Sequence, residues 1–214
     1  LAQRHGIRNV AIVDDRPPLS LTSDKSSEGY RNWWPGPGDA MIRLMNRSIN
    51  LLEELAVESD NRFHLNKRGY VYLTADSERA DMMFQKASQY AQLGAGPLRV
   101  NGGYAYSANE RFDSRLDGAD LVSDPNTIRS QFPFLAPDTL AMVHARRCGW
   151  LSAQQLGMYL FERARAGGVR LIKGRVTGVT LHNNHVQAVT IRSGNNQRSI
   201  ATRNFVIAAG PHLR

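Results

Sequence analysis

Apolar residues recur at helical spacing in three stretches of the chain, and each stretch starts at a polar residue. Steps of three and four place these side chains on one face of a helix. Asp or Ser at the start favours an N-cap, and Gly at the end favours a C-cap. We expect helices at about 39–57 after Asp39, from Asp76 or Ser77 to Gly94, and from Ser152 to Gly167-Gly168.

Short runs of β-branched and other apolar residues predict strands between these helices. The first, Asn9–Val13, is typical of a strand buried on both faces of a parallel sheet, and Asp14-Asp15 follows it. Other strands are expected at 69–74, at 169–172 and in an antiparallel meander over about 176–191, and 205–211 is expected to be an apolar strand that runs into a small-residue turn. Residues 95–147 carry many turn signals and predict irregular structure, with short strands and one short helix after Asp124. This order of elements indicates an α/β fold.

Composition narrows the class of protein. The 214 residues are 42% hydrophobic and 21% charged, which is typical of a globular chain, and no apolar run approaches the roughly 18 residues of a membrane span. The net charge is +8, but the densest basic spots are pairs such as Lys67-Arg68 and Arg146-Arg147, so we expect a diffuse solvated surface and no nucleic-acid partner. One cysteine and no signal-like start favour the cytoplasm and exclude a Cys-rich zinc site.

Two neighbouring segments carry candidate chemistry. In a dinucleotide-binding βαβ unit, the acid that ends the second strand accepts hydrogen bonds from a ribose hydroxyl, and Asp14 has that position. The loop from Thr22 to Arg31 contains hydroxyls, a glycine and a cation, groups that suit a pyrophosphate and an electron-rich ring. The alternatives are a solvated turn residue for Asp14 and a plain Ser-rich loop for the second segment.

Other candidates have ordinary alternatives too. Cationic neighbours could lower the pKa of Cys148, yet a lone cysteine without an assigned base is more often a bystander. The histidines show no metal-ligand spacing, so no metal site is predicted, and His182 and His185 fit a solvated turn. Trp33-Trp34 either wall a pocket or pack in the core, and we favour the core.

The order of these features resembles the D-amino-acid oxidase-like (DAO) superfamily of FAD-dependent oxidoreductases, which includes sarcosine and glycine oxidases. Five segments carry the resemblance across the whole chain: Val10–Asp14, Thr22-Ser23 through Ser27-x-Gly29-x-Arg31, Gly149–Ala153, Gly174–Val179 and Val206–Pro211. Ser152 stands where the family commonly has Asp, and His212 where it often has an aromatic residue. The family's GxGxxG strand and C-terminal half have no counterpart, so we expect the chain to be a section of a longer protein.

The resemblance implies an incomplete Rossmann-like FAD-binding region (1–62 and 148–214), an inserted α+β substrate or cap region (63–147) and a β-meander. It implies FAD held without a covalent bond, because the histidine that some relatives use for attachment has no counterpart among residues 24–28. The cofactor-binding residues that it implies are Asp14, Thr22, Ser23, Ser26, Ser27, Arg31, Val176, Ala208, Ala209 and Gly210. For Arg31 the alternative is a surface ion pair.

The implied activity is hydride transfer from a C–H next to an amine, in an amino acid or secondary amine, to the flavin. The catalytic residues and the oligomeric state are not predicted. Two alternatives stay open: a flavin-binding assembly protein without turnover, and a basic nucleic-acid-binding module. Because half of the pyrophosphate cradle is absent, we expect the 214-residue chain alone to bind FAD weakly or not at all.

Overall fold

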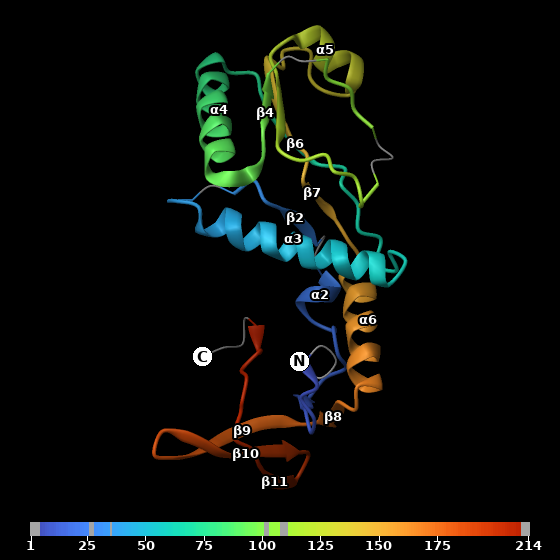
Figure 1. Cartoon of the computed structure of the whole chain (residues 1–214), viewed down its shortest axis with the longest axis vertical. Helices are drawn as coiled ribbons and strands as arrows, with labels where there is room; N and C mark the ends of the chain where they lie inside the picture. Colours follow the sequence, from blue (N-terminus) through green and yellow to red (C-terminus); the bar gives the residue numbers. More distant parts are fainter. Residues whose placement is uncertain (1–4, 26–27, 35, 101–102, 108–110, 211–214) are drawn as a thin grey trace. The chain divides into compact units, whose positions relative to one another are not determined.

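A computed structural model describes residues 5–25, 28–34, 36–100, 103–107 and 111–210 (Figure 1). The chain divides into two compact units. Unit 1 comprises residues 1–24 and 160–214, and unit 2 comprises residues 25–159. The strands and helices together make the mixed α/β fold that the sequence predicts. No helix in the described part of the chain combines the length and hydrophobicity needed to cross a membrane.

Unit 1 contains a parallel strand pair and a meander. Its elements are β1 (Ala11–Asp14), most of α2 (Thr22–Lys25), the second half of α6 (Ala153–Ala166), β8 (Arg170–Lys173), β9 (Arg175–His182), β10 (His185–Ser193) and β11 (Asn196–Ala201). β1 pairs in parallel with β8, and β9, β10 and β11 form an antiparallel sheet in the order β11-β10-β9. Asn183 and Asn184 both have positive φ in the β9–β10 turn, the conformation that suits a two-residue hairpin. The predicted meander is confirmed.

Two predictions about unit 1 strands are wrong. β1 is not buried on both faces: Ile12 is 40% exposed, and β8 is the only strand that pairs with β1 among the described residues. Residues 205–209 form no strand, and Val206 is 75% exposed. Their apolar character favours a strand, but a strand also needs a partner for its backbone groups, and no described segment pairs with this one.

Unit 2 is built around a four-stranded sheet in the order β3-β6-β5-β4. Its elements are β2 (Gly29–Arg31), α3 (Ala40–Glu58), β3 (Tyr70–Thr74), α4 (Ser77–Tyr90), the π-helical turn η1 (Ala91–Ala95), β4 (Leu98–Val100), β5 (Ala119–Val122), α5 (Pro125–Gln131), β6 (Ala141–Ala145), β7 (Cys148–Trp150) and the first half of α6. Within residues 95–147, the short strands and the short helix after Asp124 that the sequence predicts are confirmed, and β6 and β5 lie in the middle of the sheet.

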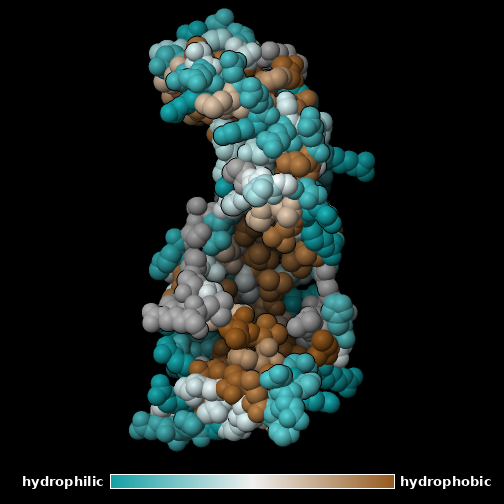
Figure 2. Space-filling view, turned by 90° about the vertical axis from the view of Figure 1, so that its left-hand side faces the viewer, coloured by the Kyte–Doolittle hydropathy of each residue, from teal (hydrophilic) through white to brown (hydrophobic). Residues whose placement is uncertain are grey.

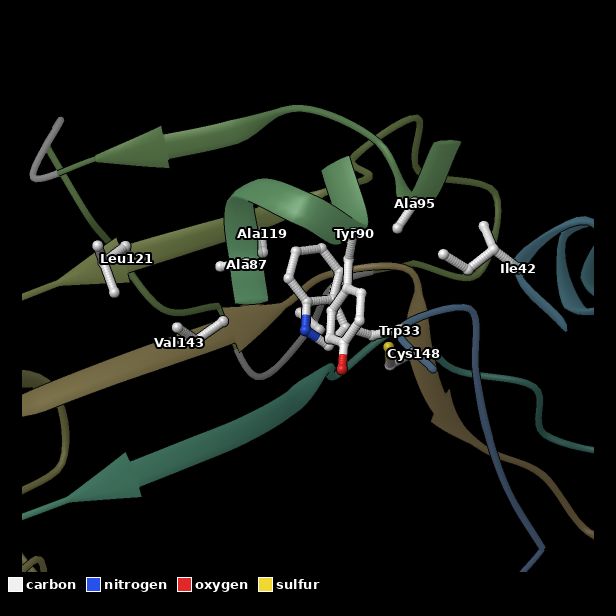
Figure 3. Close-up of a cluster of buried hydrophobic side chains, with 10 residues drawn as sticks. Trp33, Ile42, Ala87, Tyr90, Ala95, Ala119, Leu121, Val143 and Cys148 are labelled. Carbon is white, nitrogen blue, oxygen red and sulfur yellow. The ribbon is translucent and has the colours of Figure 1, made fainter. Parts of the chain in front are cut away.

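Successive side chains of β5 and β6 point to opposite faces of this sheet and contribute to a core on each face. Leu121 and Val143 pack on the face covered by α4, in the cluster that includes Trp33 and Tyr90 (Figure 3). The next residues, Val122 and Met142, pack on the opposite face with residues of α5. Since both faces are covered, all five residues of β6 are buried.

Side-chain caps start three of the helices where the sequence predicts them. Asp76 accepts from the Arg79 backbone N–H at 2.9 Å in α4, and Asp124 accepts from two backbone N–H groups in α5. Ser152 Oγ accepts from the Gln155 N–H at 3.3 Å in α6. Asp39 is the N-cap residue of α3, but its carboxylate makes no cap hydrogen bond and lies 3.8 Å from Arg43 instead.

Candidate functional site

In unit 1, the acid that ends β1 lies beside the segment 174–176. The Gly174 N–H donates to the Asp14 carbonyl at 2.9 Å, which continues the β1–β8 pairing, and Val176 follows half-buried in β9. A Cβ at Gly174 would lie 2.8 Å from the Arg192 carbonyl oxygen and from Ile191 Cγ2, so only glycine fits this corner. Residues 160 positions apart in the sequence are thus brought together by one parallel pair.

The Asp14 carboxylate makes one hydrogen bond to the backbone. Its Oδ1 accepts from the Arg16 backbone N–H at 3.0 Å. Arg175, which follows Gly174, pairs with Asp15 at 2.9 Å. Within the described residues, Asp14 takes part in no ion pair. The acid predicted to accept hydrogen bonds from a ligand therefore keeps acceptor capacity at the carboxyl end of a parallel strand.

In unit 2, the segments that end at Arg31 and begin at Gly149 form one antiparallel pair. β2 pairs with β7 in the register Gly29↔Trp150, Tyr30↔Gly149 and Arg31↔Cys148. A Cβ at Gly29 would overlap the Tyr70 hydroxyl, and one at Gly149 would overlap the Asn66 carbonyl. Both glycines are therefore required for close packing around this pair.

Arg31 is held by aromatic rings. The guanidinium carbon lies 4.3 Å from the centroid of the Trp34 ring and 5.5 Å from that of Tyr70, both within cation–π range. Its Nε is buried and has no hydrogen-bond partner among the described residues. Arg31 likewise makes no ion pair within that part of the chain, so the alternative of a surface ion pair is not what the structure has. Trp33, next to Trp34, is 4% exposed and packs edge-on against Tyr90, as favoured for the core.

The remaining predicted residues fall in several places. Thr22 and Ser23 lie on the four-residue helix α2, with Ser23 half-buried, and Ala208, Ala209 and Gly210 are exposed near the end of unit 1. Ser26, Ser27 and His212 lie outside the described residues. Arg31 belongs to unit 2, whereas the other described residues of the predicted set belong to unit 1.

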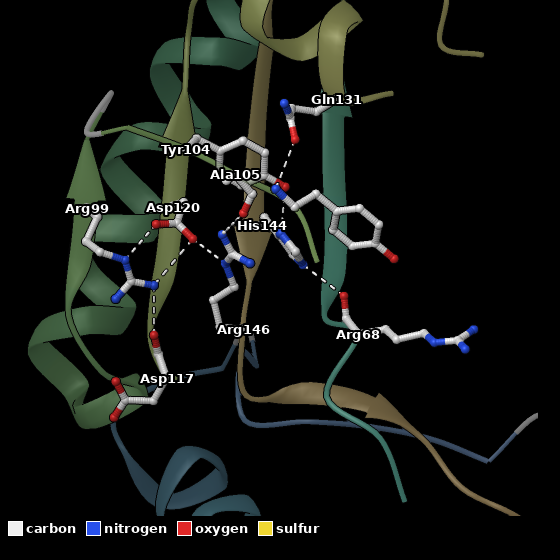
Figure 4. A network of polar contacts seen from close by, with 10 residues as sticks. Arg68, Arg99, Tyr104, Ala105, Asp117, Asp120, Gln131, His144 and Arg146 are labelled. Atoms are coloured by element: carbon white, nitrogen blue, oxygen red, sulfur yellow. Dashed lines mark hydrogen bonds and ion pairs between the residues drawn. The ribbon is translucent and has the colours of Figure 1, made fainter. Parts of the chain in front are cut away.

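A buried polar network in unit 2 was not predicted (Figure 4). Asp120 on β5 receives hydrogen bonds from Arg99 Nε, at 2.6 Å, and from Arg146 Nε. Burial would raise the pKa of Asp120, but these two hydrogen bonds hold it below its usual value. Arg146 is 8% exposed, and Lys67, which pairs with Glu53 at 2.8 Å, is 6% exposed. The diffuse solvated basic surface that the sequence predicts does not include these two cations.

His144 lies opposite Asp120 on β6 and joins the same network. Its Nδ1 is 2.8 Å from the Tyr104 hydroxyl, and its Nε2 is 3.0 Å from the Arg68 carbonyl oxygen. Because a carbonyl only accepts, Nε2 carries the proton and Nδ1 accepts from Tyr104. Burial and the charge of Arg146 lower the pKa of His144 to about 4, so the ring is neutral. In the sequence, Asp120 is an isolated acid in a turn-rich region. No pattern around it distinguishes a residue of a buried network from a loop residue.

Cys148 and the other histidines do not form a reactive centre in the described residues. Burial raises the pKa of Cys148 to about 12, so the lowered pKa that its cationic neighbours suggested is wrong. His182 and His185 are exposed in the β9–β10 turn, as expected. The described residues also hold no group of three His, Cys, Asp or Glu that could bind a metal ion.

Comparisons with known proteins agree with this fold. The family model described as FAD dependent oxidoreductase matches residues 1–214. L-proline dehydrogenase from P. horikoshii is similar in structure, with a TM-score of 0.69, 18% identity, and 91% of this chain and 44% of that chain covered. Glycine oxidase from Bacillus cereus ATCC 14579 is similar with a TM-score of 0.66 and 14% identity. The match covers 91% of this chain and 48% of that chain.

A third structure is L-amino acid deaminase from Proteus myxofaciens in complex with anthranilate. It has a TM-score of 0.70 and 16% identity, and the match covers 95% of this chain and 40% of that chain. The chain thus spans less than half the length of these three solved structures. A comparison with curated proteins found no match.

Proposed function

Since the chain belongs to the family of FAD-dependent oxidoreductases, we propose that its two paired segments contribute to an FAD site. The residues present fit FAD. Asp14 offers carboxylate oxygen to ribose hydroxyls, and the buried, unpartnered Nε of Arg31 offers a donor in a cationic group. One observation carries the proposal: within each unit, the tertiary structure brings together two segments that carry the resemblance, Asp14 with Gly174 in unit 1 and β2 with β7 in unit 2.

The role of each residue follows from its chemistry. Asp14 accepts from the ribose, and Val176 supplies an apolar contact for the adenine beside it. The hydroxyls of Thr22, Ser23, Ser26 and Ser27 donate to anionic oxygens, Arg31 offsets negative charge at the flavin, and Ala208-Ala209-Gly210 lets the backbone approach the cofactor. Bound FAD is held without a covalent bond and supplies the hydride acceptor. The proposed regions stay 1–62 and 148–214 for FAD, and 63–147 for the substrate or cap.

The proposed reaction is oxidation of a C–H next to an amine in an amino acid or secondary amine. The solved structures of similar fold support this proposal, since they include a glycine oxidase, an L-proline dehydrogenase and an L-amino acid deaminase. The described residues contribute binding and orientation, because the titratable groups buried in unit 2 are engaged with one another.

The test is FAD titration into the protein at its full natural length, followed by flavin fluorescence. Asp14→Asn should weaken FAD binding about tenfold or more, because a ribose hydrogen bond to a charged acceptor is lost. Asp15→Asn is the matched control and should change the affinity little, because that carboxylate pairs with Arg175. Equal affinities for wild type and Asp14→Asn would refute this assignment.

A second measurement separates an enzyme from a flavin-binding protein without turnover. The FAD-loaded protein is mixed anaerobically with amino acids and secondary amines, and the visible flavin band is recorded. Bleaching by a member of this panel supports the proposed reaction. A band that stays unchanged with every substrate, together with tight FAD binding, favours an assembly role instead.

A further inference from the structure

A groove on unit 1 runs along β8. Its volume is about 920 Å³, and its walls come from the second half of α6, from residues 168–172 and from β11. All of the lining residues belong to unit 1, and none of them is among the residues proposed above for FAD. This inference is therefore independent of the proposed function.

The rim of the groove is basic. Arg165, Arg170 and Arg198 line it from α6, β8 and β11, and all three are exposed. Within the described chain none of them makes an ion pair, and no acidic residue is among the lining residues. The guanidinium carbon of Arg165 lies 5.8 Å from the centroid of the Phe161 ring, which orients one of the cations along an apolar wall. Three cations from three elements thus make the rim of the groove basic.

The inner part of the groove is apolar. Phe161 and Ile200 are half-buried in its wall, and Leu171 on β8 is 41% exposed. Figure 2 shows that hydrophobic residues also reach the surface on the face it displays. Burying such side chains against an apolar ligand stabilises a complex, and guanidinium groups at the rim bind carboxylate or sulfonate oxygens.

We propose that this groove binds an amphipathic anion, a carboxylate or sulfonate that carries an alkyl or aryl body. The apolar body contacts Phe161, Leu171 and Ile200, and the anionic head is bound by the arginines. The volume lies within the range of small-molecule sites. A bare anion would leave the apolar wall in water, and a neutral apolar molecule would leave the arginines without a partner.

The test uses 8-anilino-1-naphthalenesulfonate, an aryl sulfonate whose fluorescence rises on binding. The double variant R165Q/R198Q removes two cations from the groove. R192Q/R203Q is the matched control, since it removes two exposed arginines of unit 1 that do not line the groove. We expect the groove variant to bind the probe about tenfold more weakly and the control to stay close to wild type. Equal losses in both would show a general charge effect and overturn the proposal.

Competition with the bound probe identifies which parts of a ligand the groove recognises. Decanoate should displace the probe, whereas decanol, which lacks the charge, and inorganic phosphate, which lacks the apolar body, should not. Displacement by decanol as effective as by decanoate, or no saturable probe binding to wild type, would overturn the proposal. Circular dichroism confirms that each variant is folded, and the single variants R165Q and R198Q, each expected about threefold weaker, replace the double variant if it unfolds.

Discussion

At the scale of single residues, Asp120 shows how burial changes the role of an acid. Its side chain is 10% exposed and lies between Arg99 and Arg146, the second of which has a side chain only 9% exposed. Removing one partner of a buried pair costs more than the pair contributes, because the other charge is left buried without compensation.

We therefore expect Asp120→Asn to lower the free energy of unfolding by about 3 kcal/mol. Urea denaturation of the wild type and the variant measures this change. Asp113→Asn is the control, because Asp113 forms a comparable bidentate pair with Arg111 in exposed positions and should shift the urea midpoint little. Similar midpoints for both variants would contradict the role assigned to Asp120.

His144 should make stability depend on pH. Its pKa is lowered from 6.5 to about 4 by burial, so between these values the unfolded chain binds a proton that the folded chain does not. Stability should therefore be complete above pH 6.5 and fall as the pH decreases toward 4, by on the order of 3 kcal/mol in total. Asp120, whose pKa is also lowered, adds a further loss only below its ordinary value of 3.8.

The variant His144→Gln isolates this contribution. An amide can accept from Tyr104 and donate to the Arg68 carbonyl, yet it does not titrate. Urea unfolding at several pH values between 7 and 4 should give a shallower slope for the variant than for the wild type. Parallel slopes would exclude His144 as the source.

At the scale of elements, the pair β2–β7 depends on a close approach between Gly29 and Tyr70 of β3. A Cβ at residue 29 would overlap the Tyr70 hydroxyl, and the Cζ atom of that ring would be 3.2 Å away. The ring also lies beside the Arg31 guanidinium. Gly29 is thus linked, through Tyr70, to the cation proposed to face the flavin.

This link predicts a non-additive double mutant. Gly29→Ala should destabilise the protein, because the added methyl group would overlap the Tyr70 hydroxyl. Tyr70→Phe removes that hydroxyl and should recover part of the loss, with a coupling energy of about 1 kcal/mol. Urea unfolding of the wild type, both single variants and the double variant gives the coupling. Strict additivity would show that the hydroxyl is not the obstacle.

At the scale of the whole molecule, the chain forms one unit that is discontinuous in sequence and one that is continuous. Unit 1 combines both ends of the chain through the β1–β8 pair, and unit 2 forms its sheet from residues 70–145. Two of the segments that carry the resemblance, those in β1 and β2, pair with strands far away in sequence. The FAD titration of Asp14→Asn belongs to this scale because Asp14 ends the strand that joins the two ends of the chain in unit 1.

Local signals in the sequence determined the helices, their caps and the hairpin of the meander. Asp76, Asp124 and Ser152 cap where their spacing from apolar runs predicts, because capping is a contact within a few residues. The order of segments also indicates the family without any geometry. The predicted acid, Asp14, needed only its position after a strand to be singled out.

Only the tertiary structure decided burial, pairing and partners. The apolar run 205–209 lacks a strand partner among the described residues, whereas the turn-rich region 95–147 supplies the centre of a sheet. Likewise, the polar residues Asp120, Arg146 and His144 are buried in a network that no local pattern signals. The physical reason is that hydrogen bonds between strands and the solvation of a charge depend on groups distant in sequence.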